Sequence, residues 1–440
     1  MRLLLRFSLP MLVGNIFQQF YSMVDAMIVG RFVGVDALAA VGATGGMSFL
    51  VLGFVIGLAN GFCVVVSQRF GARDEAGLRR CVAMTMLLSL IVTAVATAAS
   101  FLGTEPMLRA MNTPENIFSD SAAYIGIIFL GLGASLFYNL FSGLLRAVGD
   151  SKTPLYFLCL SSALNVVLDL LFVVTFSMGV AGAAWATILS QGVSALLCLV
   201  YMLKKFPILR TGRADWAWHG PMVRRLARMG IPTALSNSVT AIGCMILQVT
   251  INGFGSTVVA GSSASANLEG FVYTAMNAFS QAAVTFTSQN MGARKYHNLD
   301  RVMRNCLLCA VVTGILLGGG AALAGRQLLH FYSSDEAVIA AGYERLWIIC
   351  GTYLLCGIMD TLASSLRGLG YSVLPMVVSL IGSCLLRLVW IATIFQLNRT
   401  PFMLYISYPI SWILTASVHL ICLLVVRRKL QKKGQNLQAA

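Results

Sequence analysis

The stretch Ser67-Gln68-Arg69-Phe70-Gly71-Ala72-Arg73 occurs a second time, 221 positions later, as Ser288-Gln289-Asn290-Met291-Gly292-Ala293-Arg294. Five of its seven residues are unchanged. An offset of 221 or 222 aligns further distinctive residues: Pro10 with Pro232, Asn15 with Asn237, Phe32 with Phe254, Leu145-Arg146-x-x-Gly149 with Leu366-Arg367-x-x-Gly370, and Pro154 with Pro375. Self-similarity at one fixed offset indicates a duplicated fold.

The composition places most of the chain in lipid. Of 440 residues, 58% are hydrophobic and 11% are charged, whereas a soluble domain has about 25% charged residues. The net charge of +15 would suit nucleic acid only on a polar domain with a basic face, and no stretch is long and polar enough to form one. We therefore expect no nucleic-acid partner.

Apolar runs of about 20 residues have the length that crosses a hydrocarbon layer of roughly 30 Å. The sequence contains twelve such runs, so it predicts an all-α integral membrane protein. The predicted spans are 8–30, 46–68, 82–103, 122–145, 155–176, 183–203, 230–254, 267–289, 305–325, 344–366, 375–397 and 403–426.

Basic residues in the loops orient these spans, because Lys and Arg concentrate on the cytoplasmic side. With the N-terminus inside, 25 of the 31 basic residues fall in the cytoplasm. Those that fall outside are Arg31, Arg109, Arg326, Arg345 and Arg399. The sequence thus predicts a multi-pass inner-membrane protein with both termini in the cytoplasm, and topology explains its basicity.

The repeat and the spans together predict two six-helix lobes. Each half contains an even number of spans, so both enter the bilayer in the same direction and are related by a pseudo-two-fold axis along the membrane normal. The predicted domains are an N-terminal lobe at 1–203, a cytoplasmic linker at 204–228, a C-terminal lobe at 229–426 and a basic tail at 427–440.

Charged residues inside the spans are few, and each costs at least about 2.5 to 3.5 kcal/mol at mid-bilayer. Asp25 and Asp169 lie deep in the first and fifth spans, with no basic residue within a helical turn. Asn165 precedes Asp169 by four positions and so shares its helix face. With Thr187 from the next span, these oxygen atoms would hold a small cation or a proton. The alternative is a polar knot that joins helices, with Asp169 protonated and bonded to Asn165.

The C-terminal half did not keep this group, since the repeat partners of Asp25, Asn165 and Asp169 are Leu247, Leu386 and Trp390. It has three secondary candidates instead. Glu269 begins the eighth span and could equally be a water-exposed interfacial residue, Asp360 lies towards the cytoplasmic end of the tenth span, and Arg387 should pair with a carboxylate or line an aqueous cavity.

The run from Pro10 to Gly34, with Gln18-Gln19-x-Tyr21-x-x-x-Asp25 and Val29-Gly30-Arg31, resembles the first helix of bacterial multidrug and toxic compound extrusion proteins. The Ser-Gln-x-x-Gly-Ala and Leu-Arg-x-x-Gly loops resemble that family too. The resemblance implies two six-helix bundles around a central cavity that opens alternately to each side.

It also implies export of cationic, amphipathic compounds in exchange for Na⁺ or H⁺. The positions that match the family's features are the cation site (Asp25, Asn165, Asp169 and Thr187), the bend of the first helix (Pro10) and the substrate cavity (Tyr21, with Asn15 and Gln18 on the same helix).

Two other functions remain open from the sequence. A flippase for lipid-linked precursors would have about fourteen spans and several cavity arginines, and a membrane-embedded enzyme would need a catalytic motif such as His-Glu-x-x-His or Gly-x-Ser-x-Gly, which we do not find. We expect no enzyme activity, no cofactor and no metal beyond Na⁺ at the carboxylates. The expected partners are organic cations and membrane lipids, and the expected state is a monomer.

Overall fold

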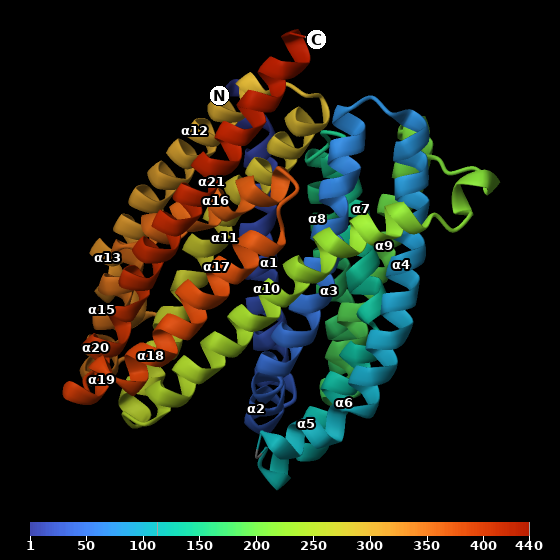
Figure 1. Cartoon of the computed structure of the whole chain (residues 1–440). Coiled ribbons are helices and arrows are strands. Elements are labelled where there is room, and N and C mark those ends of the chain that lie inside the picture. Colours follow the sequence, from blue (N-terminus) through green and yellow to red (C-terminus); the bar gives the residue numbers. More distant parts are fainter. Residues whose placement is uncertain (112, 440) are drawn as a thin grey trace. The chain divides into compact units, whose positions relative to one another are not determined.

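The computed structural model describes residues 1–111 and 113–439, which are helical apart from short turns and contain no strand. Figure 1 shows the helices in chain order. Their bounds in the N-terminal half are α1 (Arg2–Phe32), α2 (Val35–Ala43), α3 (Gly45–Gly71), α4 (Glu75–Leu102), α5 (Thr104–Ala110), α6 (Glu115–Leu130), α7 (Leu132–Ala147), α8 (Lys152–Asp169), η1 (Leu170–Thr175), α9 (Gly179–Lys205), η2 (Pro207–Leu209) and η3 (Arg213–Trp216). Those in the C-terminal half are α10 (Gly220–Asn252), α11 (Ser256–Gly292), α12 (Tyr296–Thr313), η4 (Gly314–Gly318), α13 (Gly319–Leu323), α14 (Gly325–His330), α15 (Glu336–Gly351), α16 (Tyr353–Gly368), α17 (Val373–Ser379), η5 (Leu380–Leu385), α18 (Leu386–Ala392), α19 (Ile394–Leu397), α20 (Pro401–Tyr405) and α21 (Ser407–Ala439).

Among the described residues, ten of the twelve predicted spans are helical segments long and apolar enough to cross a membrane. Eight are continuous helical segments, and two are helix pairs, α6 with α7 and α15 with α16, that bend by 44°. The other two are α1, with 31 residues, and α11, with 37. At 1.5 Å per residue these helices are about 46 and 55 Å long, which is enough to cross a bilayer.

The duplication is visible in where the helices begin. Five helices of the second half each begin 221 positions after a helix of the first half. The pairs of first residues are Val35 and Ser256, Glu75 and Tyr296, Glu115 and Glu336, Leu132 and Tyr353, and Lys152 and Val373. The repeat in the sequence therefore extends to the three-dimensional structure.

The repeated loops share an uncommon backbone conformation. Arg73 and Arg294 have φ angles of 55° and 57°, in the left-handed region that side chains rarely adopt. Each follows a helix whose last carbonyl groups accept hydrogen bonds from the turn, as in helix ends of this kind. Gly149 and Gly370 end α7 and α16 in the same way, with φ angles of 98° and 96°. These loops thus recur because they end equivalent helices.

A repeated hydrogen bond shows the same relationship. The Asn15 side-chain nitrogen donates to the carbonyl oxygen of Thr274 at 2.9 Å. Its repeat partner, Asn237, donates to the carbonyl oxygen of Gly53 at 3.1 Å. Gly53 lies 221 positions before Thr274. The asparagine predicted as a repeat marker therefore fastens equivalent helices in both halves.

The chain packs into two compact units. The N-terminal unit is Phe17–Ala241, and the C-terminal unit is Met1–Ile16 together with Ile242–Ala440. Both boundaries fall inside helices, α1 and α10. This division differs from the predicted lobes, because the first 16 residues pack in the C-terminal unit, where Leu4 joins a core with Phe279. The predicted linker contains η2, η3 and the start of α10 and belongs to the N-terminal unit. The role of the two lobes in transport stays a prediction.

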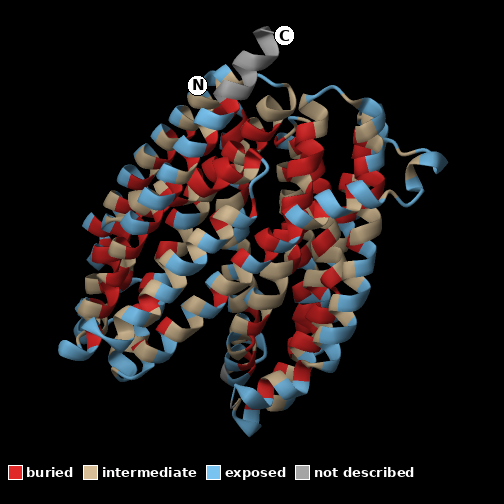
Figure 2. Ribbon diagram, in the orientation of Figure 1, coloured by how far each residue is buried: buried red, intermediate tan, exposed pale blue. Residues whose placement is uncertain are grey.

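Helix α21 illustrates how the helices meet their surroundings. Its buried side chains recur every three or four positions, as in Trp412, Thr415, His419, Leu423, Val426 and Leu430, and Figure 2 shows this stripe beside exposed positions. The exposed side is apolar too, with Ile413, Val418, Ile421 and Val425. A helix that is hydrophobic all round suits a membrane span. Residue 440 of the predicted basic tail, and the side chains of 431–439, lie outside the described residues.

Candidate functional site: a carboxyl pair in the N-terminal unit

Two acidic residues, one half-buried and one buried, meet in the N-terminal unit. Asp25 lies in the second half of α1, and Asp169 is the last residue of α8. Their carboxyl groups form a side-chain hydrogen bond with each other. Asp169 is fully buried, and the π-helix η1 begins at the next residue. Such π-turns are frequent at functional sites.

The amide of Asn165 connects this pair to the neighbouring helix α9. In the orientation that satisfies both groups, its nitrogen donates to Asp169 Oδ2 at 2.9 Å and its oxygen accepts from the Thr187 backbone nitrogen at 3.2 Å. The Thr187 hydroxyl donates to the Ala183 carbonyl oxygen at 3.0 Å. The structure thus brings together all four residues predicted for the cation site.

Two tyrosines complete the group. Tyr21, one turn before Asp25 on α1, hydrogen-bonds to the side chain of Thr187. Tyr124 of α6 lies close enough to Tyr21 and to both carboxyl groups to interact with them electrostatically. The sequence analysis placed Tyr21 in the substrate cavity and did not single out Tyr124. Tyrosines are too common in membrane spans for that position to be found from composition.

The carboxyl pair has no basic partner in the part of the chain that the structure describes. Among the described residues, neither Asp25 nor Asp169 forms an ion pair, and the Oδ1 atom of each is buried without a hydrogen-bond partner. Two carboxylates close enough to share a hydrogen bond repel each other unless a proton or a cation lies between them. Oxygen atoms are the ligands that hard cations prefer. The arrangement can therefore bind a proton or a small cation.

The C-terminal unit holds an ion pair that the sequence analysis did not predict. Arg345 of α15 donates to both carboxylate oxygens of Glu269 of α11, from Nε at 2.7 Å and from Nη2 at 2.9 Å. Its Nη1 donates to Ser262 at 2.6 Å. The two residues are only 6% and 7% exposed. Of the two alternatives left open for Glu269, the water-exposed interfacial residue is therefore wrong, and Arg345 lies inside α15 and not in an external loop as expected.

The other two secondary candidates have different surroundings. Asp360 hydrogen-bonds to Tyr273 and interacts with Arg367. Arg387 donates from Nε to the Ser411 hydroxyl at 3.0 Å and stacks on the Tyr408 ring, 4.2 Å from its centre. Within the described part of the chain Arg387 forms no ion pair with a carboxylate, so the first of its two predicted environments was wrong.

The family model described as MatE matches this chain twice, at residues 10–171 and 232–393. The two matches coincide with the two copies of the repeat and cover most of the chain. The chain belongs to the MatE family.

Relatives of this MatE chain carry transporter names. It is 30% identical over 388 residues to the probable multidrug resistance protein YpnP of Bacillus subtilis (strain 168), covering 87% of this chain and 86% of YpnP. It is 28% identical over 381 residues to the probable multidrug resistance protein YoeA of the same organism, covering 85% and 82%. A crystal structure of a MATE protein in complex with MaL6 superimposes with a TM-score of 0.91 at 22% identity, covering 98% of this chain and 97% of that one.

These findings confirm the predicted family and the all-helical fold of twelve membrane helices in two lobes. The MatE chain is a multi-pass membrane protein of a multidrug efflux transporter family. Its relatives belong to a family of transporters.

The remaining predicted positions of the MatE chain lie along α1. Pro10 lies inside the helix, whose helical backbone continues through it. Asn15 uses its amide nitrogen to bond Thr274, and Gln18 is exposed. The bend at Pro10 and the cavity-lining role of Asn15, Gln18 and Tyr21 stay predictions.

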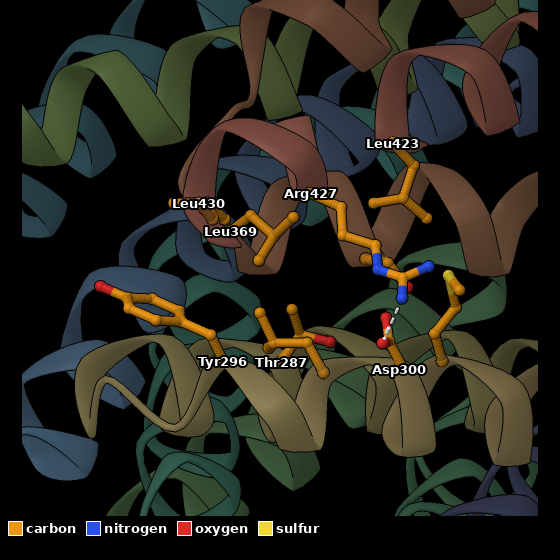
Figure 3. A pocket seen from close by; sticks show the side chains of 10 residues that line it. Thr287, Tyr296, Asp300, Leu369, Leu423, Arg427 and Leu430 are labelled. Atoms are coloured by element: carbon orange, nitrogen blue, oxygen red, sulfur yellow. Dashed lines mark hydrogen bonds and ion pairs between the residues drawn. The ribbon is translucent and has the colours of Figure 1, made fainter. Parts of the chain in front are cut away.

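A small pocket lies at one end of the C-terminal unit, between α12, α16 and α21, and Figure 3 shows the ion pair between Arg427 and Asp300 at its side. Its lining residues are Thr287, Tyr296, Leu299, Asp300, Met303, Ser365, Leu369, Leu423, Arg427 and Leu430. The cavity has a volume of about 30 Å³, and one water needs roughly 10 to 15 Å³ on the same measure. This pocket can hold a few waters and no drug-sized molecule.

Proposed function

We propose that this MatE chain exports cationic, amphipathic organic compounds in exchange for Na⁺ or H⁺ by alternating access, with Asp25 and Asp169 as the coupling site. The observation that carries the proposal is the buried carboxyl pair without a basic partner among the described residues. Acidic residues at membrane depth mark ion pathways and proton relays in transporters.

The coupling follows from the charge of the pair. A cation that arrives from outside binds between the two carboxyl groups and removes their repulsion. The site, with one negative charge fewer, then attracts a cationic substrate less strongly, and the substrate leaves to the outside. When the cation is released inward, the carboxylates regain their charge and attract the next substrate. Asn165 and Thr187 hold Asp169 in place through this cycle, and Tyr21 links Thr187 to α1.

The proposed location is the inner membrane, with both termini in the cytoplasm and the protein a monomer in contact with lipid. Arg69, Arg73, Arg294 and Lys295 lie in the repeated loops that this orientation places inside, in accord with the positive-inside rule. We expect a green fluorescent protein fused to the C-terminus to fluoresce and an alkaline phosphatase fused there to be inactive. An active phosphatase fusion would place the C-terminus outside the cytoplasm and would contradict the proposed orientation.

Efflux from vesicles tests the function. We expect purified protein, reconstituted in lipid vesicles, to move a fluorescent organic cation when a Na⁺ or an H⁺ gradient is imposed separately, and the gradient that drives movement identifies the coupling ion. Vesicles without protein control for leakage. If neither gradient drives movement of any cation tested, the exchange mechanism is wrong.

A further inference from the structure

Arg387 is a buried positive charge that the proposed cycle does not use. It lies fourteen residues after the start of the span Val373–Leu397 and ten before its end, so at the helical rise it is about 21 Å from one boundary and about 15 Å from the other. It is 9% exposed. An arginine at this depth is costly, so each such residue requires a partner or a function.

The hydrogen bonds of Arg387 to the described residues involve its Nε atom and not its two terminal nitrogen atoms. The Nε atom is bonded to Ser411, and the guanidinium carbon lies over the rings of Tyr408 and Trp412, 4.2 and 6.0 Å from their centres. No described residue accepts a hydrogen bond from Nη1 or Nη2, and neither atom is among those sealed off from solvent. The two donors that form the fork of an arginine therefore point to accessible space.

The rings fix the direction of this fork. Trp412 stacks on Tyr353 at 5.5 Å between ring centres, with 17° between the planes, and packs edge-on against Tyr408 at 5.8 Å. Tyr353 and Trp412 are buried. An arginine held against two aromatic rings loses little further freedom when it binds, and its planar fork matches the two oxygen atoms of a carboxylate or phosphate.

The repeat shows that the C-terminal unit carries positive charge close to the positions that correspond to the carboxyl pair. Tyr124 and Thr187, which surround the carboxyl pair in the N-terminal unit, have Arg345 and Tyr408 as their partners 221 positions later. Arg387 directly follows Leu386, the partner of Asn165. The positions of the two carboxyl groups hold Leu247 and Trp390 in the C-terminal unit, and two arginines occur at neighbouring positions instead, Arg345 as the partner of Tyr124 and Arg387 one residue after the partner of Asn165. Glu269 neutralises Arg345, but no carboxylate among the described residues neutralises Arg387.

We infer that Arg387 is a binding site for an anionic group, a carboxylate or phosphate, of an amphipathic substrate. The substrates then include zwitterions, which carry an anion for the C-terminal unit as well as a cation. Lipid headgroups do not fit this site, because it lies at mid-span. The inference rests on the proposed export function only for what happens after binding.

Binding of two matched dyes tests the site. A rhodamine with a free benzoate is a zwitterion, and its methyl ester is the same ring system without the anionic group. With purified protein in detergent, followed by fluorescence anisotropy, we expect Arg387→Gln to bind the free acid at least about tenfold more weakly than the wild type does, since a charge-assisted hydrogen bond contributes on that scale. Binding of the ester should change less than about twofold.

Two further variants separate the site from a structural role. Arg387→Lys keeps the charge and should keep most of the preference for the free acid. Arg399→Gln removes an exposed arginine of the same unit and should leave the binding of both dyes unchanged. If Arg387→Gln binds both dyes like the wild type, or loses both equally while it elutes as a monodisperse peak, the inference is wrong. Because binding is measured without gradients, a failure of ion-coupled efflux leaves this result unaffected.

Discussion

Replacing Asp169 by Asn is expected to lower gradient-driven efflux at least about a hundredfold while the protein still inserts and folds. At an effective dielectric constant of about 20, a monovalent cation about 4 Å from a carboxylate gains roughly 4 kcal/mol. Loss of about 2.7 kcal/mol of this attraction weakens binding about a hundredfold. The isosteric amide keeps the shape of the side chain and its contact with Asn165, so the measured change is the charge. The readout is dye efflux from vesicles with the effective gradient imposed.

Asp36 offers a matched control, since it is an exposed aspartate of the same unit. Asp36→Asn should transport like the wild type. Asp25→Asn should resemble Asp169→Asn, because either change leaves a single carboxyl group. Wild-type efflux by Asp169→Asn, at equal amounts of inserted protein, would exclude the ion-coupling role of Asp169.

Replacing Glu269 by Gln is expected to lower the free energy of unfolding by about 3 to 5 kcal/mol, as measured when one partner of a buried ion pair is removed. The variant keeps one amide oxygen that can accept from Arg345 but leaves the positive charge of the buried guanidinium uncompensated, with Ser262 and the Tyr405 ring as further contacts. In detergent we expect the melting temperature to fall by roughly 10 °C. The measurement is the fraction of protein that stays monodisperse after heating.

A double variant, Glu269→Leu with Arg345→Met, removes both charges and should recover most of the lost stability, because apolar replacements of buried ion pairs are often neutral or stabilising. Recovery would separate the cost of an unpaired charge from the loss of packing. If Glu269→Gln melts like the wild type, the pair does not stabilise the C-terminal unit.

The spans and the repeat could be predicted because both depend on local residue patterns. Apolar length located the helices, and the Ser-Gln-x-x-Gly-Ala loops marked equivalent helix ends. The boundaries of the compact units could not be predicted, since they depend on how α1 and α10 pack along their length. Nothing in the residues around Ile16 or Ala241 interrupts the helix.

The carboxyl group in the N-terminal unit could be anticipated because Asn165 and Asp169 lie four positions apart on one helix. The ion pair in the C-terminal unit was not predicted because the start of the eighth span was placed too late in the sequence. The predicted span began at residue 267, but α11 begins at Ser256, in a segment rich in serine and alanine that apolar length does not detect. Glu269 is therefore thirteen residues inside the helix instead of at its entrance. The small residues Gly261, Ser262 and Ser265 were the available signal, since such residues allow close packing of helices.

The carboxyl pair occurs once, although the backbone around it occurs twice, and this sets the energetics of the exchange. If each turnover admits one monovalent ion, export of a monovalent organic cation is electroneutral and voltage does no work on it. A zwitterion has no net charge, so the same turnover carries one positive charge inward, which at 100 mV supplies about 2.3 kcal/mol. That corresponds to roughly a fortyfold concentration ratio. A transporter with a single ion site would therefore use the voltage to accumulate zwitterions outside the cell, but would depend on the chemical gradient alone for simple cations.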